Sequence, residues 1–283
     1  MKIKDIVKQS IDLHVHVGPE IIPRKFTVDE LAKIEKGKIA GIAVKSHFNI
    51  ISRIKSELKI IYSVTLNNCV GGLNSDIVYS IGKGIIWFPT ISADNYLRKS
   101  KYEIRHEWVN DPNFKPKLSK DVKVVKVTEN GKLTDKAISV LNAIKDIGSV
   151  LATGHISWQE SKLLVEEAIR LGIKKIIVTH PIYPLIDMPL DVQKEIADKG
   201  AFIEQCYSMW KIDNIPIEKI VKQIKFIGAD RCIISSDVGQ VFSKNPSESL
   251  EEFIEVLMGK GVTEKEIIMM CIENPIKLIF QKN

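Results

Sequence analysis

The apolar residues of this chain fall into short runs rich in Ile and Val, which are separated by longer segments with a helical period. Near-continuous apolar runs of this kind are typical of parallel strands that are covered on both faces. Eight runs are predicted to be strands, at residues 11–17, 39–46, 60–66, 85–91, 149–154, 175–179, 201–206 and 231–236. Capping boxes predict helix starts between them, at Thr27/Glu30, Ser157/Glu160 and Thr263/Glu266.

Eight strands that alternate with helices over 283 residues predict an α/β protein with a (β/α)8 TIM barrel. A doubly wound open sheet is the structural alternative, but no Gly-rich phosphate loop follows the first strand. No linker, repeat or low-complexity segment divides the chain. Residues 1–283 are therefore expected to form a single domain.

One region, residues 92–133, interrupts this alternation. Its first part, residues 92–121, is polar and contains Pro112 and Pro116, and its second part ends in a turn-like Glu129-Asn130-Gly131. We interpret the region as a long loop plus a small hairpin, inserted after the fourth strand of a distorted barrel. Alternatively, it supplies a barrel strand. Residues 92–121 are the predicted lid or wall of a pocket.

Composition excludes several classes of protein. The net charge of +6 is spread over scattered lysines without a like-charge block, which argues against a nucleic-acid partner. The N-terminus lacks an apolar signal region, and no apolar run is long enough to span a membrane. None of the four cysteines belongs to a CxxC pair, so all four are predicted to be buried thiols in a reducing compartment. A cytoplasmic location is expected.

Polar side chains collect where the predicted strands end. His14 and His16 lie two residues apart in the first strand, so they share one face, whereas Leu13, Val15 and Val17 are expected on the other. Of six histidines, only His106 lies in irregular sequence. The remaining strand-end residues are His47 after the second strand, His155 after the fifth, His180 after the sixth and Asp237 after the eighth. In (β/α)8 enzymes this end of the barrel carries the chemistry.

This ordered set resembles the amidohydrolase superfamily of metal-dependent hydrolases, including its phosphotriesterase-like members. The segment from Glu273 to Leu278 also resembles that family's closing helix. The resemblance implies a site for one or two divalent metals, usually zinc. By that resemblance, His14 and His16 bind the more buried metal and His155 and His180 the more exposed one. Asp237 then ligates metal and accepts the proton of the attacking water.

The chain departs from the family pattern at the bridging ligand. Binuclear members usually place a carboxylated Lys or a Glu at the end of the fourth strand, where this chain has neither. Lys45, at the end of the second strand, is the best substitute, because some relatives take the bridge from there. It could equally be an ammonium group that binds an anionic substrate. Lys126 and Glu129 are weaker candidates.

Two further polar residues lie close to these strand ends. His47 is predicted to bind substrate or to stabilise the transition state. Glu204 is an acid inside an apolar strand, where it would bind substrate or hold a histidine tautomer.

The sequence therefore predicts a metal-dependent hydrolase in which activated water attacks an amide, lactone or phosphoester bond of a small molecule. Two alternatives remain: a mononuclear metal-dependent decarboxylase or lyase, and a metal-containing barrel that binds a ligand without turnover. No nucleic-acid or membrane partner is expected, and such barrels often form homo-oligomers. The substrate follows from no readable pattern.

Overall fold

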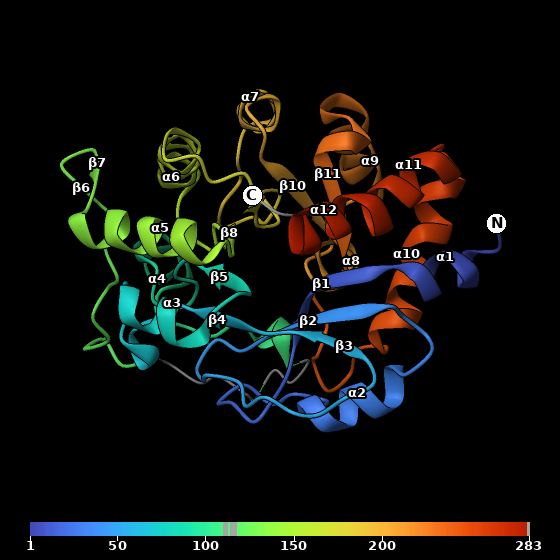
Figure 1. Cartoon of the computed structure of the whole chain (residues 1–283), viewed down its shortest axis with the longest axis horizontal. Coiled ribbons are helices and arrows are strands. Elements are labelled where there is room, and N and C mark those ends of the chain that lie inside the picture. Colours follow the sequence, from blue (N-terminus) through green and yellow to red (C-terminus); the bar gives the residue numbers. More distant parts are fainter. Residues whose placement is uncertain (110–112, 114–117, 282–283) are drawn as a thin grey trace.

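The structure is a computed structural model that describes residues 1–109, 113 and 118–281, with strands at the centre and helices outside them (Figure 1). The central strands are β1 (Ile11–His16), β2 (Gly41–Lys45), β3 (Lys59–Ile61), β4 (Ser63–Thr65), β5 (Ile85–Trp87), β8 (Val150–Ala152), β9 (Ile176–Val178), β10 (Phe202–Cys206) and β11 (Cys232–Ser235). The helices are α1 (Ile3–Gln9), α2 (Val28–Glu35), α3 (Ser75–Ile81), α4 (Asp94–Ser100), α5 (Asp135–Ile147), α6 (Trp158–Arg170), α7 (Leu190–Asp198), α8 (Tyr207–Lys211), α9 (Ile217–Ile227), α10 (Pro246–Gly259), α11 (Glu264–Ile268) and α12 (Asn274–Phe280).

The central strands form two parallel sheets, ordered β1-β2-β3 and β11-β10-β9-β8-β5-β4. Only Tyr62 separates β3 from β4, which pair with β2 and β5 respectively, so one broken strand joins the two sheets. On the other side, the N–H of His16 donates to the carbonyl of Val238 (2.7 Å), and the N–H of Asp237 donates to the carbonyl of His14 (2.8 Å). The first and last strands are therefore neighbours, and the predicted (β/α)8 barrel is confirmed.

A small apolar cluster fills the interior of the barrel. It takes alternate residues from the strands, such as Ile85 and Trp87 of β5 and Val150 and Ala152 of β8, and Leu278 of α12 joins it. The intervening residues of the strands belong to the larger cluster between strands and helices. This division follows from the alternation of side chains along each strand. Polar side chains, rather than this cluster, occupy the carboxyl ends of the strands.

The alternation fails in β1, and this corrects one expectation. Leu13 was expected to face away from the two histidines, but it lies in the interior cluster together with Ile11 and Trp87, while the ring of His14 contacts Trp87 (centroids 4.6 Å apart). The pairing of β1 with β2 shifts between Asp12 and Val15. A bulge of this kind changes which residues face inward, so His14 points into the barrel directly after Leu13.

The three predicted capping boxes are confirmed, at the starts of α2, α6 and α11. The predicted hairpin is also present, as β6 (Thr128–Glu129) and β7 (Lys132–Leu133). Asn130 and Gly131 both have positive φ values (50° and 74°), as a two-residue hairpin turn requires.

The segment predicted as a long loop, residues 92–121, is partly helical. It contains α4 and the short 3-10 helix His106–Trp108. Helix α4 forms because Tyr96 and Leu97 bury completely against the core while Asp94 stabilises its first turn. Pro112 and Pro116 lie outside the described residues.

The cysteines follow the prediction in three of four cases. Cys206, Cys232 and Cys271 are buried, but Cys69 is exposed, because it lies in a 3-10 turn after β4 rather than in a strand. All four are free thiols. None of the helices in the described part of the chain combines the length and apolar character needed to cross a membrane.

Candidate metal centre

The candidate site lies at the carboxyl ends of the strands, where the sequence places its histidines. His16 ends β1 and Lys45 ends β2, while His155, His180 and Asp237 follow β8, β9 and β11. The sequence supports this placement locally through Gly154, because a Cβ atom at that position would come within 2.2 Å of the carbonyl oxygen of Phe88. Only glycine permits this close approach of the two backbones, which places His155 at the site.

Two of the site residues have unusual backbone conformations. Asp237 has a φ of 53° and His180 a φ of 20°, in the region that residues other than glycine seldom adopt. Strained positions of this kind collect at functional sites, where the surrounding structure holds them in place.

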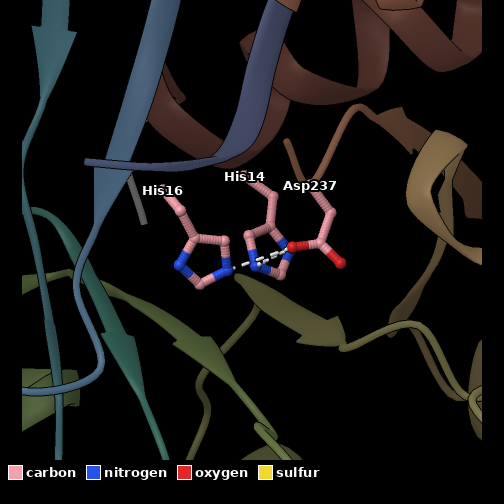
Figure 2. Close-up of side chains that lie close together, drawn as sticks. All are labelled: His14, His16 and Asp237. Atoms are coloured by element: carbon pink, nitrogen blue, oxygen red, sulfur yellow. Dashed lines mark ion pairs between the residues drawn. The ribbon is translucent and has the colours of Figure 1, made fainter. Parts of the chain in front are cut away.

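His14, His16 and Asp237 bring their side chains to one point (Figure 2). One carboxylate oxygen of Asp237, Oδ1, lies 3.1 Å from the Nε2 atom of each imidazole. The other oxygen, Oδ2, accepts a hydrogen bond from the hydroxyl of Ser208 (2.7 Å). The three donor atoms lie within 4.8 Å of one another. Two imidazole nitrogens and a carboxylate oxygen are suitable zinc ligands.

Glu204 holds His14 from the opposite side of the imidazole ring. Its carboxylate oxygens lie 3.2 and 3.3 Å from Nδ1 of His14, and it also accepts a hydrogen bond from the N–H of His180 (3.2 Å). A proton on Nδ1 that is shared with Glu204 leaves a lone pair on Nε2 of His14, next to Asp237 and Lys45, and this lone pair can bind a metal. Of the two roles expected for Glu204, the contacts match control of the histidine tautomer.

A second group of donor atoms comes from His14, Glu204 and Cys206. Burial raises the pKa of the Cys206 thiol well above its usual range, so this thiol stays protonated. The Glu204 oxygens of this group are already paired with Nδ1 of His14 and with the N–H of His180, so His14, His16 and Asp237 are the better candidate ligands.

Lys45 is buried against His14. Its Nζ atom is 3.0 Å from Nε2 of His14 and 4.1 Å from the centroid of the Trp87 ring. Its side chain is almost completely buried, and this burial lowers the pKa of the ammonium group. A buried amine with a lowered pKa loses its proton more readily and can then react as a nucleophile.

The other histidines gather around this point. The ring centroids of His155 and His180 are 5.1 Å apart, and that of His180 is 5.8 Å from that of His14. His155 and His180 are close to the three convergent residues without being part of that group. The ring of His47 lies next to that of His16 (centroids 4.6 Å apart, tilted by 40°), and its Nδ1 atom pairs with the hydroxyl of Thr90 (2.8 Å). His106, by contrast, is exposed and remote from these residues.

Burial determines the charge of these imidazoles. It lowers the pKa of His14, His16, His47 and His155 well below the usual histidine value, and it lowers that of His180 to about 3. Nearby positive charges, including that of Lys45, also lower the pKa of most of these imidazoles. Neutral imidazoles present lone pairs, which are the form that binds metals.

Several nitrogen atoms in the site lack a hydrogen-bond partner. The Nδ1 atoms of His16, His155 and His180 are buried and make no hydrogen bond to any described residue. Buried polar atoms without partners are costly and call for an explanation. The unpaired nitrogens of His155 and His180 and the convergent His14, His16 and Asp237 together fit a site that holds a divalent cation.

A cavity opens above the convergent residues, and its walls include His16, His47, His155, His180 and Asp237. The walls also include four residues that no sequence pattern singled out, namely Trp108, Ser208, Arg24 and Gln240. Trp108 comes from the inserted segment, which confirms the expectation that this segment forms part of a pocket wall. Arg24 and Gln240 lie in loops that follow strands, and Ser208 lies in α8. No periodic sequence pattern distinguishes such positions.

Solved structures with a similar fold include several hydrolases. An amidohydrolase from Pseudomonas aeruginosa is 12% identical, with a TM-score of 0.62 over 99% of this chain and 98% of that chain. The probable dipeptidase PvdM from the same organism is 11% identical, with a TM-score of 0.60 over 99% and 97%. The organophosphorus hydrolase from Deinococcus radiodurans is 12% identical, with a TM-score of 0.55 over 97% and 93%.

The chain thus shares its fold with these hydrolases, among them an amidohydrolase, as the order of the strand-end residues suggested. Within this fold, the chain belongs to a family of unknown function, DUF6282, whose model matches residues 9–204. The match includes the strand-end residues from His14 to His180, whereas Asp237 lies beyond it. No curated protein matches the chain significantly.

Proposed function

We propose that the chain is a metal-dependent hydrolase that acts on a small molecule. The observation that carries this proposal is the convergence of His14, His16 and Asp237, with all three donor atoms within 4.8 Å of one another at the carboxyl end of the barrel. Zinc is the metal we propose, because two imidazoles and a carboxylate suit it. When bound, the metal lowers the pKa of a water molecule and polarises the bond to be broken.

His155 and His180 are proposed as ligands of a second divalent metal. In support, their rings lie 5.1 Å apart, and each has a buried Nδ1 atom without a partner in the described part of the chain. Lys45 is the proposed bridge in a carboxylated form. Its support is the contact with Nε2 of His14 and the lowered pKa, because only the neutral amine can react with carbon dioxide.

Other side chains at the site are proposed to transfer the proton, to orient a ligand and to bind the substrate. Asp237 is proposed to take the proton of the attacking water and to pass it to the leaving group, while the hydroxyl of Ser208 donates to Oδ2 and fixes the orientation of the carboxylate. Glu204 orients His14. His47 is proposed to donate from Nε2 to the substrate, because Thr90 occupies its Nδ1 atom and its ring lines the cavity.

The bond broken is proposed to be an amide, lactone or phosphoester bond. Similar structures include a probable dipeptidase, an organophosphorus hydrolase and a phosphotriesterase-like lactonase from Deinococcus radiodurans. Their likeness supports this range of bonds as candidates. The free cysteines are consistent with the expected cytoplasmic location.

A metal-dependence assay tests the proposal. The purified protein, loaded with zinc, manganese or cobalt, is incubated with a lactone, a dipeptide and an organophosphate triester as representatives of the three bond types. We expect at least one to be hydrolysed, with loss of the activity on chelation and recovery when metal is returned. Turnover that persists without metal contradicts the proposal, and so does a metal-loaded protein that hydrolyses none of the three.

A further inference from the structure

Arg24 places a buried positive charge at the cavity that contains the candidate metal centre. It lies in the segment between β1 and α2, and its side chain is only 2% exposed. It contributes to the same cavity wall as His16 and Asp237. Its charge also acts on the buried imidazoles, since it contributes to the lowered pKa of both His14 and His16.

Glu20 fixes the position of this guanidinium group. One carboxylate oxygen of Glu20 pairs with Nε of Arg24 (2.5 Å). The other accepts hydrogen bonds from the hydroxyl of Ser46 (2.6 Å) and the N–H of His47 (2.8 Å). Arg24 is thereby anchored to the end of β2, beside a residue of the site. A pre-positioned guanidinium loses little conformational entropy when it binds a ligand.

The ion pair leaves part of the guanidinium without a partner. The Nη2 atom of Arg24 is buried and makes no hydrogen bond to any residue that the structure describes. Leaving a donor of a charged group unpaired in a buried position is costly. An acceptor that arrives through the cavity would remove this cost.

Gln240 supplies a second unpaired polar atom next to Arg24. Its backbone forms an antiparallel bridge with that of Arg24, and its side chain also lines the cavity. Its Oε1 atom is buried and has no partner among the described residues, while its Nε2 atom makes only a long contact (3.4 Å) with the carbonyl oxygen of Asp237. An amide carries two donors as well as an acceptor, so rotation of this group can direct its N–H toward an anion.

We propose that Arg24 and Gln240 form an anion subsite that binds a carboxylate group of the substrate. The planar guanidinium matches a planar carboxylate, and Glu20 already compensates part of the charge, so a singly charged anion fits better than a phosphate dianion. Lys45 was the other candidate for an anionic substrate, but it packs against His14 and Trp87 and is not among the described residues that line the cavity. The substrate class is therefore a small acid whose scissile bond lies close to its carboxylate.

This assignment of the substrate rests on the proposed hydrolase function, whereas the anion subsite can be tested by binding alone. The probes are N-acetylglycine, its neutral counterpart N-acetylglycinamide, and methyl phosphate, each titrated calorimetrically into metal-loaded and metal-free protein. We expect N-acetylglycine to bind most tightly. In Arg24→Met its affinity should fall by about 10- to 100-fold, as expected for loss of a hydrogen bond to a charged group. Binding of the amide should not change.

Three further variants keep the test interpretable. Arg24→Lys keeps the charge and should recover part of the affinity. Glu20→Gln/Arg24→Met avoids an unpaired buried carboxylate, should Arg24→Met fail to fold. Arg231→Met is the matched control, because Arg231 donates to the carbonyl oxygen of Gly200 (3.3 Å) and is not among the described residues that line the cavity, and it should leave N-acetylglycine affinity unchanged.

Several results would overturn the proposal. The anion subsite is refuted if the wild-type protein binds N-acetylglycine and N-acetylglycinamide with equal affinity. It is also refuted if the affinity for N-acetylglycine is unchanged in both Arg24→Met and the double variant. Tighter binding of methyl phosphate than of N-acetylglycine removes the carboxylate assignment. Arg24-dependent acid binding in a protein without hydrolase activity would retain the subsite while refuting the proposed function, so the two failures are distinguishable.

Discussion

Replacement of Asp237 by asparagine is expected to lower kcat by about 100- to 10,000-fold, the usual contribution of a positioned general acid or base. The amide cannot accept the proton of the attacking water. It can still accept the hydrogen bond from Ser208 that now reaches Oδ2 (2.7 Å), so the variant should fold normally. The measurement is steady-state kinetics on whichever substrate the metal-dependence assay identifies, beside a thermal unfolding curve.

Asp213→Asn is the matched control for this variant. Asp213 lines the same cavity, but its carboxylate pairs with Arg105 (2.6 Å) and not with the histidines. The same change of charge should therefore have a much smaller effect on kcat at this position. Equal losses in both variants would mean that Asp237 acts only through the general charge of the cavity.

Replacement of Glu204 by glutamine is expected to weaken metal binding by about 10- to 100-fold, the usual effect of removing the partner that orients a metal-binding histidine. Glu204 is fully buried and contacts Nδ1 of His14 at 3.2 and 3.3 Å. Glutamine retains a hydrogen-bond acceptor for Nδ1 of His14 but lacks the negative charge. Alanine lacks both, so Glu204→Ala should bind metal more weakly than Glu204→Gln. Competition with a chelator of known affinity gives the dissociation constant.

Glu35→Gln controls for loss of a buried carboxylate as such. Glu35 is also fully buried, but it lies in α2 outside the candidate site. Its replacement should leave metal affinity unchanged even if it alters thermal stability. If Glu204→Gln behaves like Glu35→Gln, Glu204 does not orient a ligand, and the contact with His14 contributes only to packing.

The barrel and most of the candidate site could be predicted from the sequence, because both depend on strand position. Apolar runs locate the strands, and the carboxyl ends of parallel barrel strands meet at one face. His155 and His180 are distant from His14 in sequence, yet the fold brings all three rings together (5.1 and 5.8 Å between neighbours).

Features that depend on tertiary contacts could not be predicted. The bulge in β1 reverses the expected direction of Leu13, because pairing with β2 rather than local preference sets the register. Arg24 is marked by no motif, since its significance arises only when Glu20 pairs with it beside the ends of other strands. Loop residues such as Trp108 follow no period, so their position in the cavity wall emerges only from the folded chain.

The central claim is that His14, His16 and Asp237 hold a divalent metal. Elemental mass spectrometry of the purified protein, beside a His14→Ala/His16→Ala variant, measures this most directly. We predict at least one equivalent of zinc or another divalent metal per wild-type chain, and loss of that metal from a variant that still folds. A wild-type protein that remains metal-free after reconstitution, or a double variant that retains the full metal content, would contradict the account.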